Sequence, residues 1–377
     1  MATVQVLSTL SPIEGKDRIE LARVLGWNVI VEKGYKVGDK IIYIEIDSLL
    51  PANNPDFEFL RKRCYVEKYN AMRIKTMKMN GIYSQGLVLP ISILPKKDYK
   101  VGDDVTEILG ITKFDPELEE ENKLAAHKRR PWIIRFLARN KWIKDHILFP
   151  PHKSDVWPVF ISKTDETRIQ ALGQNFLNSL SIYNPLYISE KVDGQSATFG
   201  IYKKKFYVCS RNMHLVLKDN SNHWIIATKY SLEKKLKSLK KNIYIQGEIC
   251  GPNIQKNKYN LTEKKLFIFN AYDIDKKKFY SLGELNDLSN FLKVPLVPFI
   301  DMVEIHEELA VFPIKGTTMP ATVDAFVNYA NGQSLLFPTE REGIVVRPYD
   351  SLKGNGHTGP VLGFKAISPE FTIKWDL

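Results

Sequence analysis

Cysteine is scarce in this chain of 377 residues, which contains only three. Cys64, Cys209 and Cys250 lie far apart in the sequence, and no Cys-x-x-Cys pair is present to begin a zinc-finger motif. A structural zinc site is therefore not expected. Three widely separated cysteines are also typical of a protein from a reducing compartment rather than of a disulfide framework.

Long apolar runs are absent as well. A helix that spans a bilayer needs about 18 apolar residues in a row, and the sequence contains no such run. Residues 1–4 do not resemble the start of a cleavable signal peptide. We therefore expect a monomeric protein without membrane contact, located in the cytoplasm or, in a eukaryote, in the nucleus.

Acidic residues are outnumbered by basic ones, with 43 Asp and Glu against 54 Lys and Arg, which gives a net charge of +11. Such an excess favours a polyanionic partner, most simply nucleic acid, although a lysine-rich proteome would produce the same balance. The hydrophobic fraction of 44% and the aromatic fraction of 11% are those of an ordinary globular protein. The length allows two or three domains with proper cores.

Residues 1–110 have the pattern of a small β-rich module. Segments 3–7, 26–31 and 41–46 read as short strands, and Gly34 and the stretch 37–40 read as turns between them. Short strands with glycine turns at this spacing predict a β-barrel of the oligonucleotide-binding (OB) type.

The most basic strand-like piece of this module is residues 72–81. Arg73 and Lys75 would share one face of a strand, whereas Lys78 would lie on the other. Arg73 and Lys75 are therefore candidate contacts for an RNA phosphate backbone. The alternative is an ordinary solvated outer face.

Residues 111–151 are predicted to form a helical connector. An acidic opening at 116–121 suits a helix N-terminus. After a break at Pro131, Trp132, Phe136 and Trp142 are spaced for one apolar helix face.

Residues 152–377 combine helix and strand patterns and predict an α+β domain with antiparallel sheets. Residues 164–168 offer a helix cap with early acids. Helices are expected around residues 232–239, 281–291 and 322–330, with a capping box at Ser281 and Glu284. Strands are expected at 187–190, 206–210, 243–245, 266–269, 296–300, 344–346 and 362–366.

The strand at 187–190 leads into Lys191, Val192, Asp193 and Gly194. A lysine just before a tight acidic turn is well placed for a nucleophile, because a turn glycine lets backbone approach a ligand closely. The alternative is a hairpin turn with a solvated lysine.

Four further polar sites accompany apolar strands downstream, at Ser210-Arg211, Glu248, Glu342 and Lys365. A charged residue embedded in a buried strand is costly unless it is paired or functional. One such residue means little, but an ordered set favours a shared site.

This series resembles the motifs of the covalent nucleotidyltransferase superfamily of ATP-dependent ligases and RNA-capping enzymes. Lys191 to Gly194 resembles motif I, Ser210-Arg211 motif Ia, Glu248 motif III, residues 269–273 motif IIIa, residues 342–345 motif IV and Lys365 motif V. The order is the same throughout residues 152–377.

The N-terminal module is similar to the OB module that precedes this domain in RNA ligases of the Deinococcus/Naegleria type. DNA ligases and capping enzymes place their OB domain after motif V, whereas only 12 residues follow Lys365 here, too few for a barrel. The resemblance therefore implies residues 1–110 as an OB-type β-barrel, 111–151 as the connector and 152–377 as an ATP-grasp-like antiparallel α+β nucleotidyltransferase domain.

The resemblance also implies a reaction. Lys191 attacks the α-phosphate of ATP, the AMP moves to an RNA 5′-phosphate, and a 3′-hydroxyl displaces AMP to seal the strand, with nicked duplex as the expected substrate. A lysine is nucleophilic only when neutral, and nearby cations, namely a metal ion, Lys365 and Arg211, are expected to depress its pKa.

Roles for individual residues follow from the same resemblance. Lys365 is expected to clamp the α-phosphate, and Asp193, Glu248 and Glu342 to hold hydrated Mg²⁺ or Mn²⁺. Glu248 has the alternative of binding the ribose hydroxyls. The remaining nucleotide-pocket candidates are Glu190 and Gly194, Arg211 at the ribose or the 5′-phosphate, Phe269 stacking on adenine with Phe267 as the fallback, and Arg168 at the β- or γ-phosphates.

Two other functions fit parts of the same pattern. One is a DNA ligase or a GTP-dependent RNA-capping enzyme of the same superfamily. The other is a non-catalytic nucleic-acid-binding protein that retains the fold. The lysine runs at 203–205, 264–265 and 276–278 are interpreted as solvated hairpin bends rather than as RNA contacts.

Overall fold

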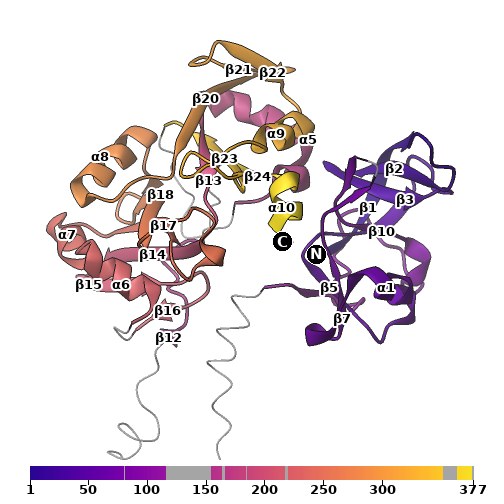
Figure 1. The fold of residues 1–377 in the computed structure, drawn as a ribbon, viewed down its shortest axis with the longest axis horizontal. Helices are drawn as coiled ribbons and strands as arrows, with labels where there is room; N and C mark the ends of the chain where they lie inside the picture. Colours follow the sequence, from indigo (N-terminus) through magenta and orange to yellow (C-terminus); the bar gives the residue numbers. More distant parts are fainter. Residues whose placement is uncertain are drawn as a thin grey trace, which may run out of the picture. The chain divides into compact units, whose positions relative to one another are not determined.

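The computed structural model describes residues 1–79, 81–115, 154–163, 166–183, 185–216, 220–350 and 363–375. The chain divides into two compact units (Figure 1): one comprises Met1–Glu120, Ile169–Leu177 and Pro369–Leu377, and the other Glu121–Arg168 and Asn178–Ser368. The predicted helical connector lies outside the described residues from position 116 onward. No helix in the described part of the chain is long and apolar enough to cross a membrane.

The first unit contains a five-stranded antiparallel sheet in the order β10-β4-β1-β2-β3. Its strands are β1 (Ala2–Pro12), β2 (Ile19–Val24), β3 (Trp27–Glu32), β4 (Lys40–Ile44) and β10 (Leu87–Pro90). β1 pairs with β4 along its first half and with β2 along its second half, and the register shifts between Leu7 and Thr9. Such a shift bends a strand, which lets the sheet curl around its buried face.

A second sheet of this unit has the order β11-β5-β7-β6, and β8 and β9 form a separate hairpin. These strands are β5 (Ser48–Pro51), β6 (Tyr65–Val66), β7 (Ala71–Ile74), β8 (Met77–Met79), β9 (Ile82–Ser84) and β11 (Thr112–Lys113). The helical elements are η1 (Pro55–Leu60), α1 (Arg61–Cys64), η2 (Glu67–Tyr69), η3 (Ile91–Ile93), α10 (Pro369–Trp375) and the first part of α5 (Ile169–Ser179). One hydrophobic cluster, which includes Trp27 and Tyr43, connects the strands. The predicted OB-type architecture is confirmed.

The second unit contains two antiparallel sheets. The larger has the order β12-β16-β15-β14-β17-β18-β19. Its strands are β12 (Ser154–Asp155), β14 (Gln195–Tyr202), β15 (Lys205–Cys209), β16 (His214–Leu215), β17 (Ile243–Cys250), β18 (Lys265–Asp273) and β19 (Lys278–Phe279). Lys203 and Lys204 form the tight bend between β14 and β15, as predicted for the first lysine run.

The other sheet has the order β22-β21-β20-β13-β23-β24. Its strands are β13 (Leu186–Lys191), β20 (Phe299–His306), β21 (Leu309–Phe312), β22 (Thr317–Pro320), β23 (Gly343–Pro348) and β24 (Phe364–Ile367). β13 is an inner strand, paired with β20 on one edge and with β23 on the other. The predicted antiparallel α+β architecture is confirmed.

Helices cover the larger sheet on one side (Figure 1), and their apolar faces share a core with β14, β17 and β18. The helical elements of this unit are η5 (Leu180–Tyr183), α6 (Asn222–Lys229), α7 (Leu232–Ser238), η6 (Gln255–Asn257), α8 (Leu282–Leu292) and α9 (Val323–Ala330). The capping box predicted at Ser281 and Glu284 is present at the start of α8. α6, which the sequence pattern did not predict, packs beside α7.

The strand predicted at 296–300 is shifted. β20 begins only at Phe299, because the preceding residues instead extend the larger sheet beside Ile268. The Ile268 amide donates to the Pro295 carbonyl at 2.8 Å, and the Val297 amide donates to the Ile268 carbonyl at 2.9 Å. This segment therefore connects the two sheets of the second unit.

Candidate active site

Lys191 is the last residue of β13, and the five residues before it in the strand are all buried. Neighbouring strands satisfy the β13 backbone on both edges, which fixes the direction in which the lysine leaves the sheet. Its side chain nevertheless remains 26% exposed. A rigid strand thus presents a reactive amine to an accessible surface.

Glu342 directly precedes β23, and both of its carboxylate oxygens accept hydrogen bonds of 2.7 Å from Lys191 Nζ. The contact follows from strand register, because Lys191 pairs with Gly343. A Cβ atom at Gly343 would lie 2.2 Å from the Ala366 carbonyl oxygen of β24. Glycine is required at this position so that β24 can pair closely with β23.

Lys365 lies on the same face of the sheet as Lys191. Ser189 pairs with Val345, and Val345 pairs with Lys365. Opposed residues of antiparallel strands point to the same side, and the two-residue period of a strand places Ser189 and Lys191 together. The two lysines predicted from the sequence to act in catalysis therefore share one surface.

Arg168 lies next to Lys365 along the backbone. The two residues form a parallel bridge, and the Lys365 amide donates to the Thr167 carbonyl oxygen at 3.0 Å. The segment that ends at Arg168 thus adds to the edge of β24. Two candidate phosphate ligands from distant parts of the sequence are thereby brought together.

Gly194 packs directly against β17. A Cβ atom at Gly194 would lie 2.4 Å from the Ile249 carbonyl oxygen. This close approach places the turn after Lys191 beside Glu248, whose negative charge acts on the Lys191 ammonium. The two sheets of the second unit therefore both contribute acidic residues to the surroundings of the lysine.

In the protein without bound ligands, neighbouring carboxylates determine the protonation state of Lys191. Burial acts to lower the pKa of Lys191, but Glu342, Glu248 and Asp193 outweigh it and raise the pKa above its ordinary value. The sequence led us to expect a pKa depressed by neighbouring cations. In this structure the acidic neighbours decide instead, so Lys191 is an ammonium ion before ligands bind.

Asp193 is held by two neighbouring residues of one loop. Lys258 Nζ forms an ion pair with Asp193 Oδ2, and the Asp193 amide donates to the Tyr259 hydroxyl oxygen at 2.7 Å. Burial and then the charge of Glu342 raise the pKa of Asp193, while Lys258 acts in the opposite direction. The aspartate of the first motif is thus fixed through both its side chain and its backbone.

Glu190 points away from the surface that carries Lys191 and is buried. Its Oε1 accepts from Ser334 Oγ at 2.5 Å, and its Oε2 accepts from the Leu335 amide at 2.8 Å. Burial is the main cause of the raised pKa of Glu190. In this structure the carboxylate anchors the segment before Glu342.

Phe269 occupies an irregular position of β18. Gln246 of β17 pairs with Asn270 and the next residue of β17 pairs with Ile268, so Phe269 is the extra residue of a β-bulge. Bulges often redirect a side chain beside an active site. Phe267, the alternative adenine-stacking residue, is instead buried in a small cluster with Val192.

A cavity of about 300 Å³ lies beside Phe269 and reaches Ser189 of β13. Ser189 is on the Lys191 face of its strand, so the cavity leads along this face away from the lysine. The Arg347 guanidinium lies 5.5 Å from the centre of the Phe269 ring and pairs with Glu166. The cavity is lined by Tyr187, Ser189, Ile268, Phe269, Leu282, Leu285, Asn286, Leu296, Val297, Pro298 and Phe299.

Arg211 lies in the turn between β15 and β16. The Ser210 amide donates to the Met213 carbonyl at 2.9 Å, which closes this turn. Arg211 is partly buried. Its backbone therefore belongs to the larger sheet, whereas the two lysines are carried by strands of the other sheet.

The candidate RNA contacts Arg73 and Lys75 belong to the first unit, at the end of β7. Arg73 pairs with Asp47 at 3.2 Å, and its guanidinium lies 3.7 Å from the centre of the Phe114 ring. Both side chains are partly buried. Arg73 thus has a clear structural function in this unit.

Three polar residues near the site were not predicted from the sequence. Lys258 and Tyr259 lie in a loop without hydrophobic periodicity, and nothing in the sequence pattern distinguishes Lys258 from its many neighbouring lysines. Arg347 offered a usable signal, because it is a charged residue inside the apolar strand 344–346 and its continuation. The same argument of burial cost that selected Lys365 applies to it.

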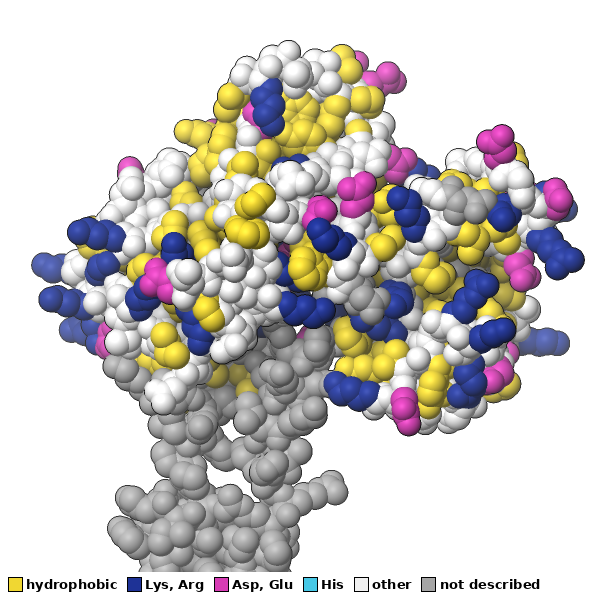
Figure 2. All heavy atoms as spheres, in the orientation of Figure 1, with side chains coloured by type: hydrophobic (Ala, Val, Ile, Leu, Met, Phe, Trp, Pro, Cys, Tyr) yellow, Lys and Arg dark blue, Asp and Glu magenta, His cyan; other side chains and the backbone are white. Residues whose placement is uncertain are grey.

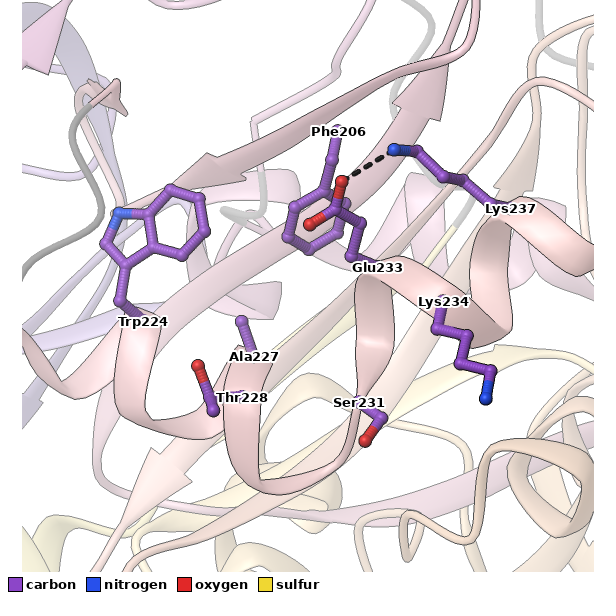
Figure 3. A pocket seen from close by; sticks show the side chains of 8 residues that line it. All are labelled: Phe206, Trp224, Ala227, Thr228, Ser231, Glu233, Lys234 and Lys237. Atoms are coloured by element: carbon purple, nitrogen blue, oxygen red, sulfur yellow. Dashed lines mark hydrogen bonds and ion pairs between the residues drawn. The ribbon is translucent and has the colours of Figure 1, made fainter.

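A larger cavity of about 520 Å³ lies between β15, α6 and α7 (Figure 3), where Lys237 pairs with Glu233 at 2.6 Å. Lys and Arg side chains gather on the surface around these elements (Figure 2). None of the candidate motif residues, such as Lys191 or Lys365, lines this cavity, so we do not assign the nucleotide to it. It is lined by Phe206, Trp224, Ala227, Thr228, Ser231, Glu233, Lys234 and Lys237.

The acidic residues around Lys191 suit a hard divalent cation, since Asp193, Glu248 and Glu342 offer only carboxylate oxygens. Within the described residues, no three His, Cys, Asp or Glu side chains converge closely enough to ligate a metal directly. Carboxylate oxygens also suit a hydrated ion that is held through its water molecules.

Family models match both parts of the chain. Residues 1–91 match an OB-fold domain, and residues 184–367 match the RNA ligase family. No curated protein sequence matches the chain.

Solved structures of Naegleria gruberi RNA ligase match nearly the whole chain. A mutant with ATP and Mn is 30% identical, with a TM-score of 0.77 over 100% of this chain and 97% of that chain. The structure with PPi and a mutant with AMP and Mn are each 29% identical, with TM-scores of 0.77 over 99% of this chain and 98% of theirs. With an OB-fold module in front of a ligase domain and end-to-end similarity to these structures, the chain belongs to the family of Naegleria-type RNA ligases.

Proposed function

We propose that this RNA ligase uses ATP to seal 3′-hydroxyl and 5′-phosphate RNA ends, at nicks in duplexes, through lysyl-AMP and RNA-adenylate intermediates. The observation that carries the proposal is the accessible Lys191 Nζ at the end of a buried strand, 2.7 Å from both oxygens of Glu342. Lys365 on the same sheet face supplies a second positive charge. The similarity to a ligase solved with ATP and with AMP supports ATP as the donor.

In the first step, Lys191 Nζ forms a bond to the α-phosphorus of ATP while the bond to pyrophosphate breaks. The ammonium must lose its proton beforehand, because only the neutral amine is nucleophilic. Glu342 is the nearest acceptor, at 2.7 Å. Release of Nζ from this carboxylate is therefore part of activation.

The negative charge that develops on the α-phosphate oxygens needs a fixed cation. Lys365 is our candidate, and Arg168 beside it is assigned to the β- or γ-phosphates. A positioned cation stabilises the transition state without reorganising during the reaction.

The base and sugar are assigned to the surface next to Lys191. We place adenine against Phe269, in the cavity of about 300 Å³ that begins at Ser189. Glu190 and Gly194, on either side of Lys191 in the chain, are assigned to the nucleotide, and Arg211 is assigned to the ribose or the RNA 5′-phosphate. Stacking on an aromatic ring explains how a mostly apolar cavity retains a nucleobase.

Asp193, Glu248 and Glu342 would hold Mg²⁺ or Mn²⁺ through water molecules. The ion would supply Lewis-acid stabilisation of phosphate charge. Their negative charges around Lys191 would attract such a cation. The presence of Mn with nucleotide in the Naegleria structures supports this choice.

Incubation of the protein with ATP or GTP labelled at the α-phosphate, followed by a denaturing gel, tests the nucleotide and the covalent intermediate. We expect label on the protein from ATP, and no label on Lys191→Ala. Label from GTP alone would instead favour a capping enzyme, and absence of label from both would favour a binding protein without catalysis.

Nicked duplexes of one sequence, with RNA or DNA on each side of the nick, test the substrate. We expect sealing to require RNA at the 3′-hydroxyl side, because the 2′-hydroxyl is the group that distinguishes RNA from DNA there. Equal sealing of an all-DNA nick would contradict the proposed specificity. Sealing of single-stranded ends alone would contradict a nicked duplex as the substrate.

A further inference from the structure

Residues 251–260 connect β17 to β18 in an unusual backbone conformation. Five residues other than glycine have positive φ: Asn253 (65°), Asn257 (47°) and Asn260 (47°), of a residue type that tolerates this region, and Gln255 (42°) and Lys256 (60°), whose residue types are uncommon there. Backbone strain of this kind persists only where the surroundings impose it, and it is concentrated at functional sites.

The loop is fixed at both sides of its bend. The Asn257 side chain donates to the Leu261 carbonyl oxygen at 2.9 Å and accepts from the Leu261 amide at 3.1 Å. Ile254 is buried in the core beneath the helices. The two residues that follow Asn257 are thereby turned inward, whereas Lys256 stays exposed.

Those two residues, Lys258 and Tyr259, both contact Asp193. Lys258 pairs with carboxylate oxygen Oδ2, and the Tyr259 hydroxyl oxygen accepts from the Asp193 amide. The Lys258 side chain is only 2% exposed. A lysine is rarely buried to this extent unless it is paired, and a buried ion pair by itself is weak evidence for stability.

We propose that Lys258 and Tyr259 are positioning residues that hold Asp193 in the orientation needed for the divalent cation. Lys258 binds Oδ2, and Oδ1 is the oxygen assigned to the hydrated metal ion. Tyr259 fixes the backbone of the same residue. This inference rests on the proposed function, because it takes Asp193 as a metal-binding residue.

Charge balance gives Lys258 a second role in the same arrangement. Asp193, Glu248 and Glu342 act on one nucleophilic lysine, and their like charges repel one another. The buried ammonium group of Lys258, paired with Asp193 Oδ2, offsets this repulsion. The carboxylates then remain available to the cation.

Binding of Mn²⁺ in the presence of α,β-methylene-ATP, measured from free Mn²⁺ by electron paramagnetic resonance, tests the inference without turnover. Partners that orient metal ligands typically contribute 10- to 100-fold to affinity. We expect Lys258→Met to raise the dissociation constant for Mn²⁺ at least tenfold. Lys256→Met, an exposed lysine of the same loop, is the matched control and should bind as the unmodified protein does.

A second comparison separates positioning from general damage to the fold. If Lys258 acts through Asp193, Lys258→Met should cause no further loss of Mn²⁺ binding in an Asp193→Asn background. The double variant also removes both buried charges, so its thermal unfolding should be closer to that of the unmodified protein than that of Lys258→Met alone. Tyr259→Phe should give a smaller rise in the dissociation constant.

The outcomes distinguish this inference from the proposed function. Unmodified protein that neither binds Mn²⁺ with the analogue nor takes label from ATP would overturn the proposed function. Unmodified protein that does both, together with Lys258→Met that binds Mn²⁺ equally well, would overturn the positioning role alone. Equal losses from Lys258→Met in both backgrounds would likewise contradict an action through Asp193.

Discussion

Two lysine–carboxylate pairs lie close together around the first motif, and they differ chiefly in accessibility. In the pair of Lys191 with Glu342, the side chains are 26% and 14% exposed. In the pair of Lys258 with Asp193, they are 2% and 13% exposed. Both pairs join a lysine to a carboxylate, but of the two lysines only Lys191 leaves part of its side chain accessible to a substrate phosphate.

The difference lies in the backbone that carries each lysine. Lys191 is the last residue of β13, and pairing of this strand with β20 and β23 fixes the direction of its backbone. Lys258 follows a run of left-handed residues that turn it inward. An ion pair at a strand end can open for chemistry, whereas one enclosed by a rigid loop is suited to hold its partner in place.

The largest effect is expected from Lys191→Arg. Arginine keeps the positive charge beside Glu342 but is not deprotonated in proteins, so it cannot act as the nucleophile. We expect no label from ATP at any Mn²⁺ concentration. Lys258→Met should instead recover label as Mn²⁺ is raised, because it weakens cation binding and leaves the nucleophile intact. Loss of label in both at saturating Mn²⁺ would remove the distinction between the pairs.

The next effect concerns the pH dependence of labelling. Glu342→Gln removes the charge that contributes most to the raised pKa of Lys191, so that pKa should fall. The neutral amine then forms at lower pH, and the rise of labelling rate with pH should shift toward lower pH. The maximal rate should drop roughly 10- to 100-fold, because a residue assigned to the cation is lost.

Labelling rates measured at saturating Mn²⁺ between neutral and alkaline pH check this expectation. Glu304→Gln, which removes an exposed carboxylate on β20, is the control and should leave the profile unchanged. A shift of the Glu342→Gln profile toward higher pH would contradict the assignment of Glu342 as the main partner of the lysine.

A smaller effect is expected from a substitution at Gly194, in the turn that follows Lys191. Gly194→Ala introduces a Cβ atom 2.4 Å from the Ile249 carbonyl oxygen, so the turn must move away from β17. Overpacking of this kind costs about 1–3 kcal/mol. Thermal unfolding should show this loss, whereas Gly283→Ala in α8, with its nearest neighbour at 3.9 Å, should be neutral or stabilising. Equal stability of both variants would mean that the turn adapts without cost.

Local signals made part of this arrangement predictable from the sequence. The capping box at Ser281 and Glu284 involves residues only three apart, and its prediction is confirmed. Lys191, Glu342 and Lys365 were grouped by an ordered motif series, and antiparallel pairing of β13, β23 and β24 brings their segments together. The RNA ligase family followed from the same series.

Features that depend on non-local contacts were missed. The segment at 296–300 has a strand-like composition, but Ile268 pairs with the residues before Phe299 and shifts the start of β20. Lys258 was indistinguishable from its neighbours, because its burial depends on left-handed backbone at residues such as Asn257. No periodicity in the sequence encodes such a path.

The smallest effect is expected from substitution of Arg73, which forms a third ion pair to compare with the other two. It pairs with Asp47 and lies over the Phe114 ring in the first unit. A partly exposed pair and a cation–π contact together contribute about 1 kcal/mol. Arg73→Ala should therefore lower stability slightly and leave labelling by ATP unchanged. Sealing of a nicked duplex, with Lys75→Ala tested in parallel, then separates the two possible roles. A structural role predicts near-normal sealing below the unfolding temperature, whereas a strong sealing defect at unchanged stability would show that Arg73 contacts RNA, as its sequence position suggested.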